Sequence, residues 1–112
     1  MATVTPAELD RLVGLLVENV NPRMVILFGS QAGGETTEHS DLDLMIIEDE
    51  RSLVGDQGKL KHIAAIYRLL RVVRIPKDIL VYSVEKFEEW QGSLNHVIGR
   101  ASREGRVLYE RQ

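Results

Sequence analysis

The segment that most constrains the fold lies between residues 24 and 47. Two apolar runs, Met24–Phe28 and Leu42–Ile47, flank a polar stretch that opens with Gly29-Ser30 and ends in an Asp-x-Asp motif. Short apolar runs bounded by turn residues are typical of buried strands. We therefore expect a strand, a glycine turn, a short helix, a polar loop and a second strand, in that order.

The polar residues of this segment predict a site for an anion and for divalent metal ions. Backbone N–H groups at the Gly29-Ser30 turn can bind an anion, and the Ser30 hydroxyl can add a donor. Asp41 and Asp43 would lie on one face of the second strand, roughly 6.5–7 Å apart at Cα. Two carboxylates at this spacing can share divalent cations. The combination predicts phosphate-ester chemistry on a nucleoside triphosphate.

A third carboxylate opens another apolar stretch, Asp78–Tyr82, which we expect to form a strand. One interpretation is an ordinary aspartate at a strand start. The other is that this strand pairs beside Leu42–Ile47, so that Asp78 joins Asp41 and Asp43 as a third metal ligand. We favour the second interpretation because two carboxylates already occupy the neighbouring strand.

The remaining elements predict an α/β (α+β) fold, with a small mixed sheet packed against helices. Thr5, Pro6 and Glu8 form the start signal of a first helix. Helical spacing, capping residues and stop signals then define the rest of the chain. The expected elements are a loop over 48–58, a helix with a broad apolar face from Leu60 to Val73 ended by Pro76, a helix Val84–Trp90 capped by Ser83, a helix Leu94–Arg103 with Leu94 inward and Gly105 at its end, and a strand or surface segment at Val107–Tyr109. The order of strands in the sheet does not follow from the sequence.

Composition narrows the class of protein. A chain of 112 residues with 44% apolar and 28% charged residues fits one domain, residues 1–112. The net charge of -3 argues against direct nucleic-acid binding, and the lack of cysteine excludes disulfides and thiolate metal sites. No apolar run suits a membrane helix and no signal peptide is evident, so we expect a cytoplasmic protein. The histidines His39, His62 and His96 match no zinc pattern.

Basic residues cluster between Lys59 and Arg74. One interpretation is a solvated helix face, which is what most charge runs form. The other is that one or more of these cations contacts nucleotide phosphates or an acidic partner. The sequence leaves both open.

The motif residues are Gly29-Ser30, Ala32, Gly34, Ser40-Asp41 and Asp43-Leu44. Together they resemble the signature of the DNA polymerase beta-type nucleotidyltransferase superfamily, and within it the minimal nucleotidyltransferase (MNT) family. The resemblance covers nearly the whole chain, including the Asp78 strand and the closing residues 103–110. One departure is Gly33, where the family often has a basic residue that would contact phosphate.

This resemblance implies a role for each site residue. Asp41 and Asp43 would ligate two Mg²⁺ ions, and Asp78 would complete the metal site and accept the proton of the attacking hydroxyl. Gly29 and Ser30 would hold the β- and γ-phosphates of ATP. The acceptor hydroxyl would attack the α-phosphorus and release pyrophosphate.

Chains this small in the MNT family resemble the antitoxin half of HEPN/MNT toxin–antitoxin pairs. The resemblance implies transfer of AMP to a tyrosine of a HEPN RNase toxin, with which the chain would form an oligomer. Three alternatives remain. The chain could modify a small acceptor such as an aminoglycoside, neutralise a toxin by binding alone, or carry its acidic strand ends by coincidence.

Overall fold

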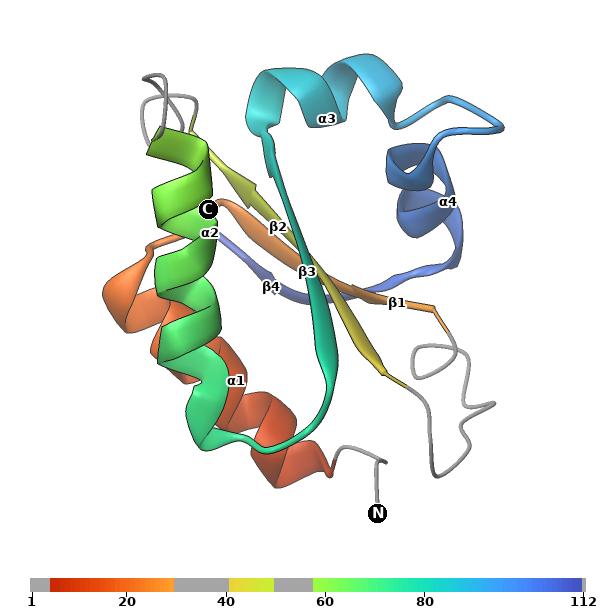
Figure 1. The fold of residues 1–112 in the computed structure, drawn as a ribbon. Helices are drawn as coiled ribbons and strands as arrows, with labels where there is room; N and C mark the ends of the chain where they lie inside the picture. Colours follow the sequence, from red (N-terminus) through yellow and green to blue (C-terminus); the bar gives the residue numbers. More distant parts are fainter. Residues whose placement is uncertain (1–4, 30–40, 50–57, 112) are drawn as a thin grey trace.

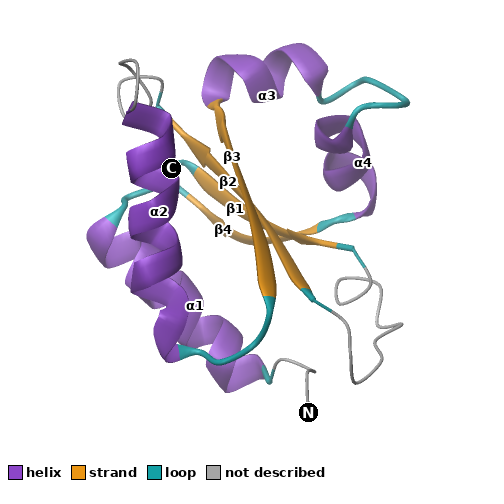
Figure 2. Ribbon diagram, in the orientation of Figure 1, coloured by secondary structure: helices purple, strands orange, loops and turns teal. Residues whose placement is uncertain are grey.

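The computed structural model describes residues 5–29, 41–49 and 58–111, and shows a four-stranded sheet with helices on both faces (Figures 1 and 2). The strand order is β3-β2-β1-β4. Among the described residues, no helix is long and apolar enough to span a membrane. The elements are α1 (Pro6–Asn19), β1 (Met24–Phe28), β2 (Leu42–Glu48), α2 (Gly58–Leu69) followed by a 3-10 turn (Leu70–Val72), β3 (Lys77–Ser83), α3 (Val84–Trp90), α4 (Val97–Glu104) and β4 (Arg106–Glu110).

The sheet is mixed, as predicted. Strand β1 runs antiparallel to both β2 and β4, whereas β2 and β3 are parallel. The carboxyl end of β1 therefore meets the amino ends of β2 and β3 at one end of the sheet. The predicted pairing of the Asp78 strand with the Asp-x-Asp strand is confirmed, and the segment after Gly105 is a strand.

One face of the sheet packs against α1 and α2. The predicted start of α1 is confirmed: Thr5 Oγ1 accepts a hydrogen bond from the Glu8 backbone N–H at 3.1 Å, and Glu8 Oε1 accepts one from the Thr5 N–H at 2.9 Å. This reciprocal pair satisfies two donors that the helix itself cannot pair. The core on this side contains Leu12 and Leu16 of α1, Ile66 of α2 and the inward residues of the strands.

The other face of the sheet packs against α3 and α4. Phe87 of α3 and Ile98 of α4 form a second core with Ile26, Met45 and Ile47 of the strands. Ser83 caps α3 as predicted, with its Oγ accepting from the Lys86 N–H at 3.1 Å. The two helices also meet through Trp90 and His96, whose rings stack with centroids 4.7 Å apart.

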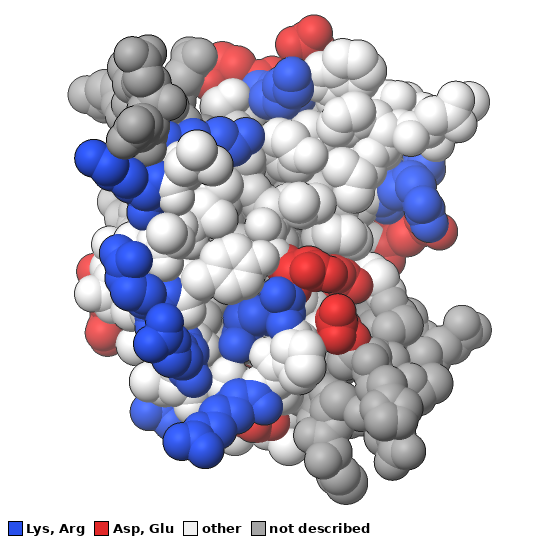
Figure 3. All heavy atoms as spheres, in the orientation of Figure 1, with Lys and Arg blue, Asp and Glu red and all other residues white. Residues whose placement is uncertain are grey.

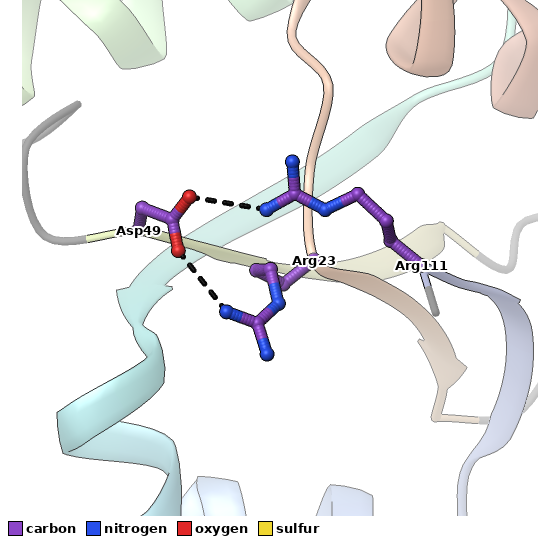
Figure 4. Close-up of polar contacts among 3 residues, drawn as sticks. All are labelled: Arg23, Asp49 and Arg111. Carbon is purple, nitrogen blue, oxygen red and sulfur yellow. Dashed lines mark hydrogen bonds and ion pairs between the residues drawn. The ribbon is translucent and has the colours of Figure 1, made fainter.

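Charged residues tie together the end of the sheet where β2 finishes. Asp49 Oδ1 accepts a hydrogen bond from Arg23 at 3.2 Å, and its Oδ2 accepts one from Arg111 at 3.0 Å (Figure 4). The Arg111 guanidinium first, and then that of Arg23, holds the pKa of Asp49 below its usual range. Three strands are thus joined where β1 begins and where β2 and β4 finish.

Two predicted boundaries around β2 and α2 are wrong. Glu48 belongs to β2 and Gly58 to α2, so neither is part of a loop. The apolar face predicted from Leu60 to Val73 does pack against the core, but it is narrower than predicted, because Leu60 is 71% and Val72 52% exposed. The helix packs on the sheet face through Ile66, with Ile63 and Leu69 partly buried against the same core, and Leu70 of the following turn is fully buried.

The last helix begins later than predicted. It starts at Val97, with the His96 ring nitrogen Nδ1 accepting a hydrogen bond from the Ile98 N–H at 3.1 Å. Leu94 precedes the helix and is 77% exposed, so its predicted inward position is wrong. Helical spacing alone missed the cap because histidine is not a common capping residue. Gly105 ends the helix as predicted.

Candidate active site

The strands bring the predicted carboxylates to one end of the sheet. Asp43 is the second residue of β2 and lies opposite Phe28 of β1. On its other side Asp43 is in register with Asp78 of β3. Strands lie about 4.8 Å apart, so these two aspartates are near neighbours. Asp41 lies directly before β2 and is exposed.

Strand alternation determines which face carries these groups. Leu42 and Leu44 point into the core beneath α1 and α2, whereas Met45 packs into the core beneath α3 and α4. Asp43 shares the face of Met45, and Asp78 shares the face of Leu80. The carboxylates therefore lie on the face that carries α3 and α4. Figure 3 shows acidic side chains close to basic ones near the middle of the visible surface.

The backbone at Gly29 lies close to the Asp43 carboxylate. Its φ of 78° lies in the left-handed region that glycine adopts without a steric penalty. A Cβ added at Gly29 would lie 2.2 Å from Oδ2 and 3.1 Å from Cγ of Asp43. Both the backbone conformation and the space therefore require glycine at this position. The turn that ends β1 thus lets the Asp43 carboxylate lie against the backbone.

The three carboxylates interact electrostatically. Burial is the main cause that raises the pKa of Asp43, and the negative charges of Asp78 and then Asp41 raise it further. Such mutual repulsion is what a bound cation would relieve. The candidate metal-ligand atoms are all carboxylate oxygens, which suit hard cations such as Mg²⁺. The residues present therefore fit a magnesium site by chemistry.

The arrangement of these side chains is open rather than convergent. Within residues 5–29, 41–49 and 58–111, no three His, Cys, Asp or Glu side chains already converge as a metal site would require. The backbone brings Asp43 and Asp78 side by side, and ligation would need their side chains to turn toward a shared ion. Ser30, Gly33 and His39 lie outside the described residues, as does the short helix predicted after the glycine turn.

A buried acid–base pair was not predicted. Glu48 is only 1% exposed, and its carboxylate contacts His62 Nε2 of α2. Burial raises the pKa of Glu48, and the hydrogen bond and charge of His62 partly oppose that rise. Strand alternation was the available signal, since Glu48 continues the inward series of Leu42 and Leu44. The pair lies at the end of β2 opposite to Asp43.

The comparison with known families agrees with this geometry. The family described as "Polymerase beta, Nucleotidyltransferase" matches residues 10–112. The chain belongs to this family. The match spans β1, β2 and β3, and so includes every strand that contributes to the candidate site. No curated protein sequence matches the chain.

Solved structures show the same fold at low sequence identity. A Sulfolobus solfataricus protein described as a nucleotidyltransferase has a TM-score of 0.55 and 15% identity, over 94% of this chain and 86% of that one. A toxin–antitoxin structure with AMP-PNP has a TM-score of 0.59 and 17% identity, over 93% and 74%. A MntA-HpeT toxin–antitoxin with two aspartate-to-glutamate substitutions has a TM-score of 0.57 and 15% identity, also over 93% and 74%. The fold is thus that of the polymerase beta-type nucleotidyltransferases.

Proposed function

We propose that this chain is a Mg²⁺-dependent nucleotidyltransferase that acts as an antitoxin by transferring AMP from ATP to a tyrosine of a HEPN RNase toxin. The observation that carries the proposal is the juxtaposition of Gly29, Asp43 and Asp78 at one end of the sheet. A glycine turn that ends a strand next to paired carboxylates suits a triphosphate and its metal ions.

Asp41, Asp43 and Asp78 would hold two Mg²⁺ ions. When bound, these ions would offset negative charge on the entering and leaving oxygens of the transferred phosphate. The exposed carboxylates of Asp41 and Asp78 are accessible to solvent and ligand, whereas Asp43 is half-buried. Asp43 would therefore be the most enclosed member of the set, because its carboxylate lies against Gly29.

The proposed reaction is a displacement at the α-phosphorus of ATP. The tyrosine oxygen forms a bond to the α-phosphorus, the bond from that phosphorus to the bridging oxygen breaks, and pyrophosphate leaves. The Asp78 carboxylate takes the phenolic proton. The backbone at Gly29 and Ser30 orients the β- and γ-phosphates, so that catalysis consists of positioning and electrostatics.

The comparisons support the proposal at the level of family and fold. The description of the family names nucleotidyl transfer. Two structures of similar fold are toxin–antitoxins, and one of these is described with AMP-PNP, an ATP analogue. The tyrosine acceptor and the HEPN class of partner come from the MNT resemblance of the motif residues.

The test is intact-mass spectrometry of the protein encoded beside this chain's gene. The chain, that protein, ATP and Mg²⁺ are incubated together, and the expected result is a gain of one or more AMP units on the neighbour. Parallel reactions with GTP, CTP and UTP define the base preference. The control is Asp41→Asn with Asp43→Asn, which should give no gain. An unchanged mass with every nucleotide would contradict the proposal.

Neutralisation by contact alone is the second candidate. It is favoured by the observation that carboxylates in the described part of the chain do not converge as a ready metal site. The same double substitution separates the candidates in cells that express the neighbouring protein. Growth rescued by the chain but not by the substituted chain supports catalysis, and equal rescue by both supports contact alone.

A further inference from the structure

The strongest unexplained feature of the molecule is the charge of α2 and the segment that leads to β3. Six of the chain's 14 Lys and Arg residues lie between Gly58 and Lys77, and none of its 17 Asp and Glu residues does. Figure 3 shows basic side chains in a row along α2. Among the described residues, no carboxylate lies within ion-pair distance of any of the six. The six are Lys59, Lys61, Arg68, Arg71, Arg74 and Lys77.

The basic residues nearest the candidate active site line a groove. It has a volume of about 360 Å³ and is open to solvent on its outer side. Its floor is apolar, since Val73 and Ile75 are almost fully buried. We call it the β3-edge groove. It is lined by Tyr67, Arg71, Val73, Arg74, Ile75 and Lys77.

At the β3-edge groove, one backbone donor of the edge strand is already paired within the chain. Strand β3 is at the edge of the sheet, where free N–H groups normally invite another strand. Here the Ile79 N–H donates to the Tyr67 hydroxyl at 3.0 Å, and Lys77 Nζ donates to the Val73 carbonyl at 2.8 Å. These bonds hold Tyr67 and Lys77 across the edge and leave Arg71 and Arg74 exposed.

The groove also adjoins the candidate active site. Lys77 and Asp78 are consecutive residues of β3, and Lys77 lies opposite Leu42 while Asp78 lies opposite Asp43. A molecule seated in the groove therefore lies against the same strand that carries Asp78. An acceptor held there would have its hydroxyl near the α-phosphate of a bound nucleotide.

We propose that the β3-edge groove docks an acidic segment of the acceptor protein, which presents Asp or Glu side chains together with an apolar side chain beside its acceptor hydroxyl. This inference rests on the proposed function for the identity of the acceptor. Charge complementarity carries it, because a basic rim with no carboxylate favours an acidic partner. The apolar part of the segment fits the groove floor and the exposed Val72, which is adjacent in sequence to Arg71 and Val73 of the groove.

A protein segment suits this surface better than a nucleic acid does. An extended phosphate backbone that followed the groove would continue past Asp78, Asp43 and Asp41, whose charges would repel it. The exposed apolar side chains of Leu60 and Val72 also offer nothing to a sugar–phosphate backbone. An acidic side chain of a protein, in contrast, is a local charge that the arginines can bind without extending over the carboxylates.

The test compares two charge reversals of equal size. The first is Arg71→Glu with Arg74→Glu, in the groove. The second is Arg11→Glu with Arg100→Glu, at exposed positions of α1 and α4. The probe is the purified protein encoded beside this chain's gene, and the measurement is its Kd for each form by calorimetry without ATP, at roughly 0.03 M and 0.3 M salt.

The groove reversal should raise Kd roughly ten- to a hundredfold over that of the unaltered chain at the lower salt, and by a smaller factor at the higher salt. The control reversal should change Kd by no more than about twofold, because its residues lie outside the groove. Equal Kd values for both reversals, or no binding by the unaltered chain, would overturn the inference. So would binding of an RNA oligonucleotide that depends on Arg71 and Arg74 while protein binding does not. Thermal unfolding of each form shows that the fold is retained.

The same samples separate this inference from the proposed function. If the unaltered chain never adds AMP to its neighbour, yet binding depends on Arg71 and Arg74, the docking inference stands and the proposed function fails. If the groove reversal adds AMP as fast as the unaltered chain, at protein concentrations below Kd, the proposed function stands and the docking inference fails.

Discussion

Gly29→Ala is the substitution that most directly tests the link between backbone and site. The added Cβ would lie 2.2 Å from Asp43 Oδ2, whereas ordinary contact begins at 3.4 Å. The carboxylate oxygen must therefore move by about 1.2 Å. In addition, the φ of 78° places alanine in the left-handed region. That conformation costs roughly 1–2 kcal/mol for a residue with a Cβ.

The two effects should appear in different measurements. Left-handed strain lowers the free energy of unfolding, and the expected loss is about 1–3 kcal/mol once crowding against Asp43 is included. The shift of the carboxylate acts on the reaction, since a misplacement of about 1 Å can cost on the order of a hundredfold in rate. We expect AMP transfer to fall by roughly that factor while most of the chain stays folded.

The assay pairs urea unfolding with the initial rate of AMP transfer to the partner. Gly14→Ala is the matched control, because a Cβ at Gly14 meets no atom within 4 Å. Gly14 lies inside α1, so its replacement should raise stability by roughly 0.5–1 kcal/mol and leave the transfer rate unchanged. Asp43→Ala provides the second background, in which Gly29→Ala should cost only the backbone strain.

One result would refute this reasoning. If Gly29→Ala transfers AMP at nearly the rate of the unaltered chain, the close approach of Gly29 to Asp43 has no part in catalysis. If its stability cost is the same with and without the Asp43 carboxylate, the two residues do not couple at all. Either outcome would remove the main observation behind the proposed function.

Three further predictions concern stability. Asp43→Asn should stabilise the chain at pH 7 without divalent ions. Because the folded pKa of Asp43 is raised, ionisation of this carboxyl costs stability as pH rises above 3.8. The Tm of the variant should therefore exceed that of the unaltered chain at pH 7, and the two should be equal at pH 3. Asp49→Asn should do the reverse. Because the folded pKa of Asp49 is lowered, its ionised carboxylate stabilises the fold above pH 3.8. The Tm of the unaltered chain should therefore exceed that of the variant at pH 7, and the two Tm values should converge as pH falls below 3.8. Parallel curves of Tm against pH would contradict the ion-pair account. Leu16→Ala, at a fully buried position, should cost about 2–5 kcal/mol in urea unfolding with an unchanged m value; a loss below about 1 kcal/mol would mean that α1 packs loosely.

Local chemistry made most of the fold predictable. The Thr5 and Ser83 caps, and the apolar runs of β1 and β2, each carry their signal within a few residues. The face of the strand on which Asp43 lies was also predictable, because successive side chains of a strand alternate between its two faces. The position of Asp78 required one further assumption, that β3 pairs with β2, and this pairing is confirmed.

The parts that the sequence did not predict depend on contacts between distant residues. The apolar face of α2 was overestimated because helical spacing records which residues share a side, and not how much of that side another element covers. The burial of Glu48 depends on His62, fourteen residues away, and no short-range pattern pairs them. The order β3-β2-β1-β4 likewise depends on long-range pairing, and so does the groove at the outer edge of β3.

The distribution of stabilising and destabilising features along the sheet supports a functional interpretation of its carboxylate end. At that end Gly29 adopts a left-handed backbone, and burial first and then the like charges of Asp78 and Asp41 raise the pKa of Asp43. At the opposite end Asp49 accepts hydrogen bonds from Arg23 and Arg111, which join three strands. Evolution readily removes repulsion that has no use, because one Asp→Asn change suffices. Carboxylates that repel each other beside a glycine that leaves room for one of them are therefore what we expect if the proposed cation and anionic ligand bind there. The β3-edge groove extends this argument to the acceptor, since a partner's acidic segment held there would lie against the strand that carries Asp78.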